Sequence, residues 1–117
     1  MTAAAESAAI KSVARDYIEG WFTADADRMA RALHPDLVKR AVRDGGLWTL
    51  TRDEMVAATA GGGGRADAAA QVITVDDIRV DAEIASVRVV STAYIDFLHL
   101  LNDGDGWRIV NAVWRSR

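Results

Sequence analysis

The chain has 117 residues, half of them apolar, and a formal net charge of −3. This length suits one domain, residues 1–117, whose core needs no metal or disulfide. The absence of cysteine excludes thiol chemistry and zinc–thiolate sites, and the interspersed charges lack the basic footprint of a nucleic-acid binder. No apolar run is long enough to span a membrane, and the N-terminus has no signal-peptide pattern. We therefore expect a cytoplasmic protein with neither nucleic-acid nor membrane partners.

The N-terminal part of the chain predicts two helices. Residues 3–22 carry apolar side chains at spacings of three and four, with charged residues on the other side. Asp25 can cap a second helix that runs through Leu33. His34-Pro35 is expected to end that helix, because the residue before a proline is disfavoured in the helical region.

A third helix is predicted after Thr51, whose side chain can form a capping box with Glu54. It would end at the glycine run 61–64. This run lacks the Lys-Ser/Thr pair of a phosphate-binding loop. We interpret it as a flexible surface loop or a pocket lid.

The remaining segments alternate in polarity or are rich in β-branched residues, which predicts strands. They are residues 37–43, 47–50, 71–80, 84–101 and 107–114, where 84–101 is one long strand or one strand with a bend. The order of elements indicates an α+β fold, with helices packed on one face of a curved antiparallel sheet.

The last two predicted strands are apolar on both faces. A turn at residues 103–106 would pair Leu98 with Asn111 and Asp96 with Val113. One face would then hold Tyr94, Asp96, Leu98, Leu100, Ile109, Asn111 and Val113, and the other Ile95, Phe97, His99, Leu101, Val110, Ala112 and Trp114. Helices can cover only one face, so we expect a homodimer through the other.

Two stretches resemble the superfamily of nuclear transport factor 2 (NTF2), ketosteroid isomerase and SnoaL-like polyketide cyclases. They are YIEGWFTADADRMARALHPDLVKR at 17–40 and YIDFLHLLNDGDGWRIVNAVW at 94–114. Within the superfamily they are similar to the bacterial group described as "putative lumazine-binding". The resemblance implies a cone-shaped fold over the whole chain. Its three helices would pack on the concave face of the sheet with a pocket between them, and such proteins are often dimeric.

Ketosteroid isomerase implies roles for two residues. Tyr17 falls on the position of its oxyanion-hole tyrosine. Asp96, which follows Ile95, falls on that of a protonated aspartate that donates a second hydrogen bond. A buried aspartate could instead be a structural residue, satisfied by neighbouring polar groups. The position of that enzyme's general base holds Ala41, so the same isomerisation is not expected.

Other polar residues are weaker candidates. His34, Asp36 and Asp44 are possible proton-transfer groups, although His34 could equally bond carbonyl groups at a helix end. His99 lies on the opposite strand face from Asp96 and is expected at the dimer surface. The two histidines have no ligand-like spacing, so neither a metal nor a cofactor is expected.

Two functional hypotheses remain. In the first, a pocket binds an unknown small molecule, a hydrophobic oxygenated ring, with or without an isomerase- or cyclase-like reaction in which Tyr17 and Asp96 stabilise an oxyanion. Lys39 and Arg40 would meet an anionic ligand at the mouth or face water. The expected lining is Trp21, Met29, Leu33, Trp48, Met55, Tyr94, Leu98 and Asn111. In the second, a non-catalytic dimeric module has its cavity filled by side chains, so an open cavity with Asp96 inside would favour the first.

Overall fold

The computed structural model describes residues 2–117 and contains three α-helices and one six-stranded sheet. The helices are α1 (Ala3–Thr23), α2 (Ala26–Ala32) and α3 (Arg52–Ala60), and a short 3₁₀ turn covers Arg65–Asp67. The strands are β1 (Leu33–Arg43), β2 (Gly46–Thr51), β3 (Thr74–Asp81), β4 (Ile84–Val90), β5 (Tyr94–Asn102) and β6 (Trp107–Ser116). Among residues 2–117, no helix is both long enough and apolar enough to cross a membrane.

Each helix begins at a capping residue, and two of the three caps, Asp25 and Thr51, were predicted. Thr2 accepts a hydrogen bond from the first turn of α1, and Asp25 caps α2 in the same way. Thr51 and Glu54 form both bonds of the predicted capping box at the start of α3. Helix α2 ends at Ala32, and His34-Pro35 lies in the first residues of β1, so the strand begins earlier than predicted.

The sheet has the strand order β2-β1-β6-β5-β4-β3 and is mixed. All neighbours are antiparallel except β1 and β6, which run parallel. The predicted α+β class is therefore confirmed, but the expectation of a wholly antiparallel sheet is wrong for this one pair. A parallel pair needs a crossover connection, and the segment from β2 through α3 to β5 provides it.

The segment predicted as one long strand is in fact a hairpin. Strands β4 and β5 pair with each other along their whole length, and residues 91–93 form the turn between them. Ser91 closes the turn: its backbone N–H donates to the carbonyl of Tyr94 at 2.9 Å, and its hydroxyl accepts from the N–H of Tyr94 at 3.0 Å. The local sequence hides the turn because β-branched residues flank it and it contains neither glycine nor proline.

A β-bulge in β6 changes which residues face the helices. Leu100 pairs with Ile109, whereas His99 pairs with Asn111, so Val110 is an extra residue in β6. The predicted register is thus correct next to the turn and wrong by one residue beyond the bulge. Ala112 and Trp114 therefore share the inner face with Asp96.

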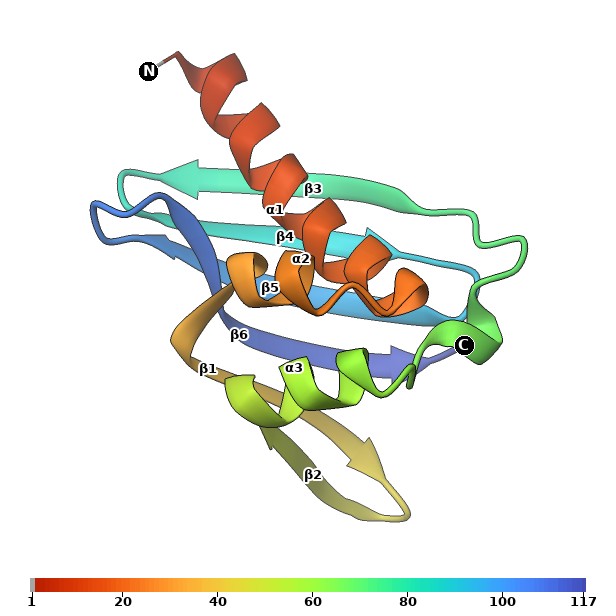
Figure 1. Ribbon diagram of the computed structural model, residues 1–117. Helices are drawn as coiled ribbons and strands as arrows, with labels where there is room; N and C mark the ends of the chain where they lie inside the picture. The colour runs from red at the N-terminus through yellow and green to blue at the C-terminus, as the bar shows by residue number, and fades with distance from the viewer. Residues whose placement is uncertain (1) are drawn as a thin grey trace.

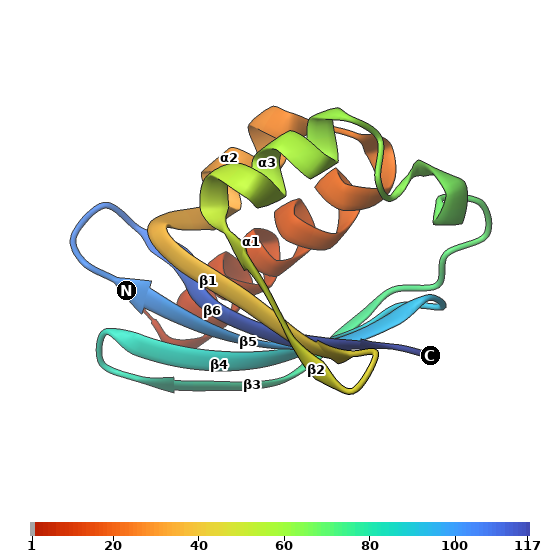
Figure 2. The ribbon, with the colours of Figure 1, turned by 90° about the horizontal axis from the view of Figure 1, so that it is seen from below.

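All three helices lie against one face of the curved sheet (Figures 1 and 2). The predicted apolar stripe of α1 is buried there, including Ile10, Ala14, Tyr17 and Ile18. These side chains meet the inner faces of β4, β5 and β6 in a single hydrophobic core. The prediction that three helices pack on the concave face is confirmed.

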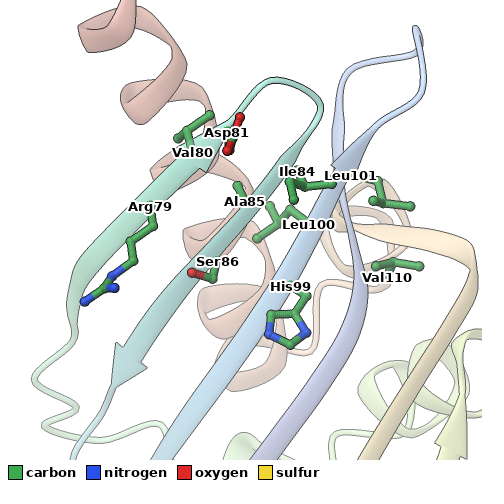
Figure 3. A pocket seen from close by; sticks show the side chains of 10 residues that line it. All are labelled: Arg79, Val80, Asp81, Ile84, Ala85, Ser86, His99, Leu100, Leu101 and Val110. Carbon is green, nitrogen blue, oxygen red and sulfur yellow. The ribbon is translucent and has the colours of Figure 1, made fainter.

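The opposite face of the sheet has no helix over it (Figure 2). It carries exposed apolar side chains, with Phe97 57% and Val113 47% accessible on paired positions of β5 and β6. This face also has an open hollow of about 380 Å³. Figure 3 shows its lining side chains, among which Arg79, Ser86 and His99 project from neighbouring strands. The outer face is therefore largely apolar, as predicted, with a polar row across it.

Candidate functional site

A cavity of about 290 Å³ lies between the helices and the inner face of the sheet. Helices α1 and α3 and the glycine run form one side, and strands β1, β2, β5 and β6 form the other. It is lined by Tyr17, Ile18, Trp21, Lys39, Arg43, Trp48, Leu50, Met55, Ala58, Gly63, Tyr94, Asp96, Trp114 and Ser116. This volume is near the lower end of the range for ligand sites, which suits a small ligand.

Tyr17 and Asp96 meet in the wall of this cavity. The Tyr17 hydroxyl donates a hydrogen bond to Oδ2 of Asp96 at 2.7 Å, and both side chains are at most 2% exposed. Tyr17 lies on the buried stripe of α1, and Asp96 lies on the inner face of β5 between apolar residues. The sequence therefore correctly placed these two residues together, 79 positions apart in the chain.

Burial controls the protonation of this pair. Burial raises the pKa of Asp96, while the nearby Lys39 ammonium and the hydrogen bond from Tyr17 act in the opposite direction. Burial, followed by the charge of Asp96, raises the pKa of Tyr17 well above its usual value of 10.0. A carboxyl with a raised pKa is more often neutral, and a neutral carboxyl can donate a hydrogen bond.

Lys39 is the second ionisable group inside the cavity. Its ammonium nitrogen lies over three aromatic rings, 5.0 Å from the Tyr17 centroid, 5.2 Å from Trp114 and 5.8 Å from Trp21. Its one hydrogen bond to the described residues is a weak contact with the sulfur of Met55 at 3.9 Å. Burial lowers the pKa of Lys39 to about 8, although the charge of Asp96 opposes this shift.

Aromatic side chains form much of the remaining wall. Trp114 contacts Trp48 and Tyr94 edge-on, with ring centroids 5.7 and 5.4 Å apart. The guanidinium of Arg43 lies 5.4 Å from the centroid of the Trp48 ring. The Tyr94 hydroxyl accepts a long bond from the indole of Trp21 and donates to Asp67. Aromatic rings line several sides of the cavity, and two cations lie in its wall. This arrangement suits a flat ligand with electron-rich atoms.

The glycine run, predicted as a flexible surface loop or a pocket lid, is partly exposed, contributes Gly63 to the cavity lining and packs against Trp21. Gly64 is buried, and a Cβ added there would lie 2.4 Å from the carbonyl oxygen of Trp21 and 2.6 Å from its ring. A Cβ on Gly63 would lie 2.6 Å from the same ring. The glycines are needed for this close approach, which fixes the position of Trp21 in the cavity wall.

The structure divides the predicted lining residues into two groups. The cavity lining includes Trp21, Trp48, Met55 and Tyr94, together with Tyr17 and Asp96. The others do not line it. Met29, Leu33 and Leu98 are completely buried in the hydrophobic core, where they pack between the helices and the sheet. Regular alternation identifies the inner face but cannot separate core positions from cavity positions on that face.

Asn111 lies on the outer face, so its prediction as a pocket residue is wrong. The bulge at Val110 turns Asn111 away from Asp96. On the outer face its side-chain amide bonds to Nδ1 of His99 at 3.2 Å and accepts from Arg40 at 3.1 Å. Arg40 therefore faces away from the cavity, whereas Lys39, its neighbour in β1, faces into it.

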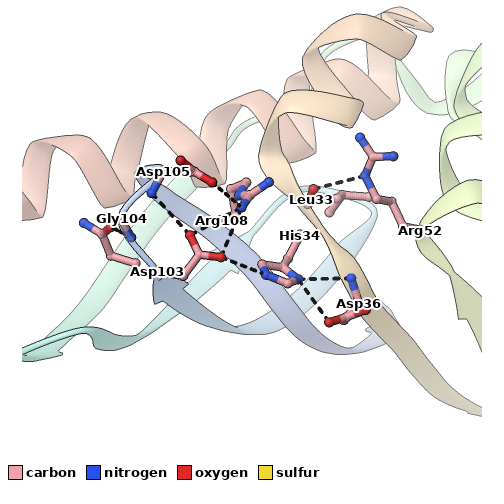
Figure 4. Close-up of polar contacts among 9 residues, drawn as sticks. Leu33, His34, Asp36, Arg52, Asp103, Gly104, Asp105 and Arg108 are labelled. Atoms are coloured by element: carbon pink, nitrogen blue, oxygen red, sulfur yellow. Dashed lines mark hydrogen bonds and ion pairs between the residues drawn. The ribbon is translucent and has the colours of Figure 1, made fainter.

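His34 does not line the cavity. Figure 4 shows it in contact with Asp103 and Asp36. Its Nε2 lies 3.2 Å from a carboxylate oxygen of Asp103, in the turn before β6, and its Nδ1 accepts from the backbone N–H of Asp36 at 3.0 Å. These contacts join the start of β1 to the β5–β6 turn. Asp36 and Asp44 also lie outside the cavity lining, so none of the three predicted proton-transfer groups is positioned for that role.

Lys39 was expected at the mouth of the pocket or in water but lines the cavity, Trp114 was assigned to the wrong face, and lining residues such as Arg43 were not predicted. The inward position of Lys39 could have been predicted from the sequence, because Lys39 alternates with Leu37 and Ala41. This alternation places all three residues on the inner face of β1. Trp114 was assigned to the outer face because the bulge was not recognised. A glycine marks many bulges in a sequence, but this one has valine at the extra position.

The sequence and the fold were compared with known proteins. The family model described as "Putative lumazine-binding" matches residues 5–115. A comparison with curated proteins gave no match. Solved structures of the same fold include an NTF2-like protein of unknown function from Silicibacter pomeroyi, 23% identical, with a TM-score of 0.84 and 100% of both chains covered.

Two other solved structures are named after enzymes. A protein described as a putative ketosteroid isomerase from Shewanella frigidimarina is 17% identical, with a TM-score of 0.69 and 92% of this chain and 94% of that one covered. A protein described as a putative scytalone dehydratase from Novosphingobium aromaticivorans is 16% identical, with a TM-score of 0.71 and coverages of 97% and 85%. These likenesses concern the fold. The chain belongs to the family described as "Putative lumazine-binding".

Proposed function

We propose that the chain is a small-molecule-binding protein whose ligand, a hydrophobic oxygenated ring, occupies the cavity beside Tyr17 and Asp96. The observation that carries the proposal is the buried 2.7 Å hydrogen bond between these residues in the wall of an open cavity. A core that merely fills space gains stability from apolar packing, and a carboxyl buried there lowers it. Both polar groups can instead bond a ligand oxygen.

The open volume supports this proposal over a module with a filled cavity. About 290 Å³ beside Asp96 is room for a ligand of one or two rings, and the wall is largely aromatic. When the ligand binds, one group of the pair would donate a hydrogen bond to the ligand oxygen. Either the Tyr17 hydroxyl turns from Asp96 to that oxygen, or a neutral Asp96 donates its proton to it. Both arrangements suit a carbonyl, enolate or phenolate oxygen.

We propose binding without proton abstraction, because none of the residues expected to act as a base lines the cavity. The position of the ketosteroid isomerase base is Ala41, a buried apolar residue on the inner face of β1. His34, Asp36 and Asp44 do not line the cavity. The proposed role of Tyr17 and Asp96 is therefore to orient and polarise the ligand, which does not require a base.

Tyr17→Phe is expected to weaken ligand binding about tenfold, because it removes a strong hydroxyl donor. Asp96→Asn is also expected to weaken binding, because an amide donates less strongly than a carboxylic acid and accepts less strongly from the Tyr17 hydroxyl than a carboxylate. Lumazine is the first compound to titrate, given the family description, and native mass spectrometry of protein from its own host would identify other ligands. Circular dichroism checks that both variants remain folded. Unchanged affinity in both variants would contradict the donor role.

We also propose that two copies of the chain associate through the outer face of the sheet. The paired side chains of Phe97 and Val113 are exposed there, on a face that no helix covers. We expect sedimentation as a dimer at micromolar concentration, and as a monomer in Phe97→Asp. Val72→Asp, at an exposed apolar residue outside the strands, is the matched control and should remain dimeric. A monomeric wild type would contradict the proposal.

A further inference from the structure

Lys39 is a buried cation without an oxygen partner among the described residues. It is 7% exposed, lines the cavity, and contacts aromatic rings and the sulfur of Met55. It forms no ion pair with Asp96, whose Oδ2 accepts instead from Tyr17. An ammonium group has three donors, and rings satisfy its charge but not its hydrogen bonds. A buried amine in this state lowers stability unless something else occupies the space.

The charges around the cavity favour an anion. Arg43 adds a second cation beside Trp48 and Trp114, and Asp96 is the one carboxylic acid in the lining. Burial raises the pKa of that acid and so favours its neutral form, and the two cations outnumber the single carboxyl in the lining. An oxyanion placed next to Lys39 would accept charge-assisted hydrogen bonds from a buried ammonium group, where such bonds are strong.

We propose that the ligand is a flat aromatic or conjugated ring with one acidic group, and that Lys39 binds the ionised oxygen of that group and so determines specificity for anions. The rings of Trp21, Trp48 and Trp114 hold the flat faces, and Tyr17 with Asp96 bonds a neutral oxygen on the same ligand. The volume limits the ligand to one or two rings. This inference rests on the proposed binding function and names its ligand class.

Calorimetric titration with 2-naphthoate and its neutral analogue 2-naphthamide tests the inference. At pH 7 we expect the wild type to bind 2-naphthoate at least about tenfold more tightly than 2-naphthamide. Lys39→Met should remove this preference while retaining amide binding. Arg40→Met is the matched control, because Arg40 is the next residue of the same strand but bonds Asn111 on the outer face. It should leave the preference unchanged.

The pH dependence in the wild type is a second readout that a merely structural lysine would not give. The amine loses its proton near its pKa of about 8, so 2-naphthoate affinity should fall between pH 7 and pH 9.5. The charged or titratable groups facing Lys39 are Tyr17, Tyr94, Asp96 and Arg43. Both tyrosines have pKa values raised above 10.0, and arginine stays protonated. The fall should persist in Asp96→Asn and vanish in Lys39→Met.

Several outcomes would overturn the inference. These are equal wild-type affinities for the two probes, a preference that survives Lys39→Met, or a preference that Arg43→Met removes in its place. In each of these cases 2-naphthamide still binds, so the proposed function stands and only the role of Lys39 fails. If neither probe nor lumazine binds the wild type at millimolar concentration, both the proposed function and this inference fail.

Discussion

Gly64→Ala is expected to lower the free energy of unfolding by about 3 kcal/mol, at the upper end of the usual cost of overpacking. A methyl group at this position would lie 2.4 Å from the carbonyl oxygen of Trp21 and 2.6 Å from its indole ring. The carbonyl belongs to helix α1, so the collision cannot be relieved by rotating one side chain. Urea denaturation of the variant and the wild type measures the effect.

Gly61→Ala is the matched control in the same glycine run. Gly61 has an ordinary helical conformation, with φ −74°, and an added Cβ would make normal contacts at 3.5 Å or more. Its denaturation midpoint should stay close to that of the wild type, or rise slightly because alanine reduces the entropy of the unfolded chain. Equal midpoints for Gly64→Ala and the wild type would contradict the close packing of the run against Trp21.

Lys39→Met is expected to raise the free energy of unfolding by about 2 kcal/mol at pH 7 in the absence of ligand. The substitution removes a buried charge and puts an apolar chain of similar length next to Met55. It leaves the Tyr17–Asp96 hydrogen bond in place. A stabilising substitution that removes anion binding would indicate that Lys39 serves function at the expense of stability. Thermal or urea denaturation without ligand provides the measurement.

The pH dependence of this gain follows from the direction of the pKa shift. The pKa of Lys39 is about 8 in the folded chain and near 10.5 in the unfolded one. The neutral buried amine therefore does not lower stability above pH 10.5. Stability is lost as the pH falls from 10.5 to about 8, because only the unfolded chain gains the proton in this range, and the loss is complete below 8. The advantage of Lys39→Met should be largest at pH 7 and small at pH 10. A gain that is independent of pH, or a loss at pH 7, would contradict the burial of an unpaired ammonium.

Local sequence patterns predicted the helices, and the resemblance to ketosteroid isomerase predicted that Tyr17 and Asp96 form a pair. Capping residues and apolar spacing act within a few residues, so the starts of α1, α2 and α3 are readable from sequence. The Tyr17–Asp96 contact depends on two faces, the buried stripe of α1 and the inner face of β5. Each of these faces follows from the local periodicity of its own element.

The errors in the predicted strands arose where an irregular feature interrupts the regular alternation of side chains. The extra residue Val110 reverses the faces of Asn111 and Trp114, because strand side chains alternate and a shift of one residue exchanges the two faces. The turn at residues 91–93 lacks glycine and proline, so one long strand was predicted where β4 and β5 form a hairpin. In both places the pairing between strands determines the structure, and the local sequence gives little indication of it.

The cavity residues were only partly predictable for a related reason. Alternation places Lys39 on the inner face of β1, but it cannot indicate that the space in front of it is open. Met29 and Leu98 also lie between the helices and the sheet, but their side chains are packed in the hydrophobic core. Whether an inward position meets a cavity depends on how α1 and α3 lie across the sheet, and this arrangement follows from packing over the whole chain.

Nuclear magnetic resonance of the four tryptophan indole N–H groups during titration with 2-naphthoate tests the central claim most directly. Trp21, Trp48 and Trp114 line the cavity, whereas Trp107 belongs to the hydrophobic core outside it. The account predicts saturable shifts for the three cavity indoles and none for Trp107. A titration in which the three cavity indoles do not shift, or in which Trp107 shifts as much as they do, would contradict a ligand site between the helices and the inner face of the sheet.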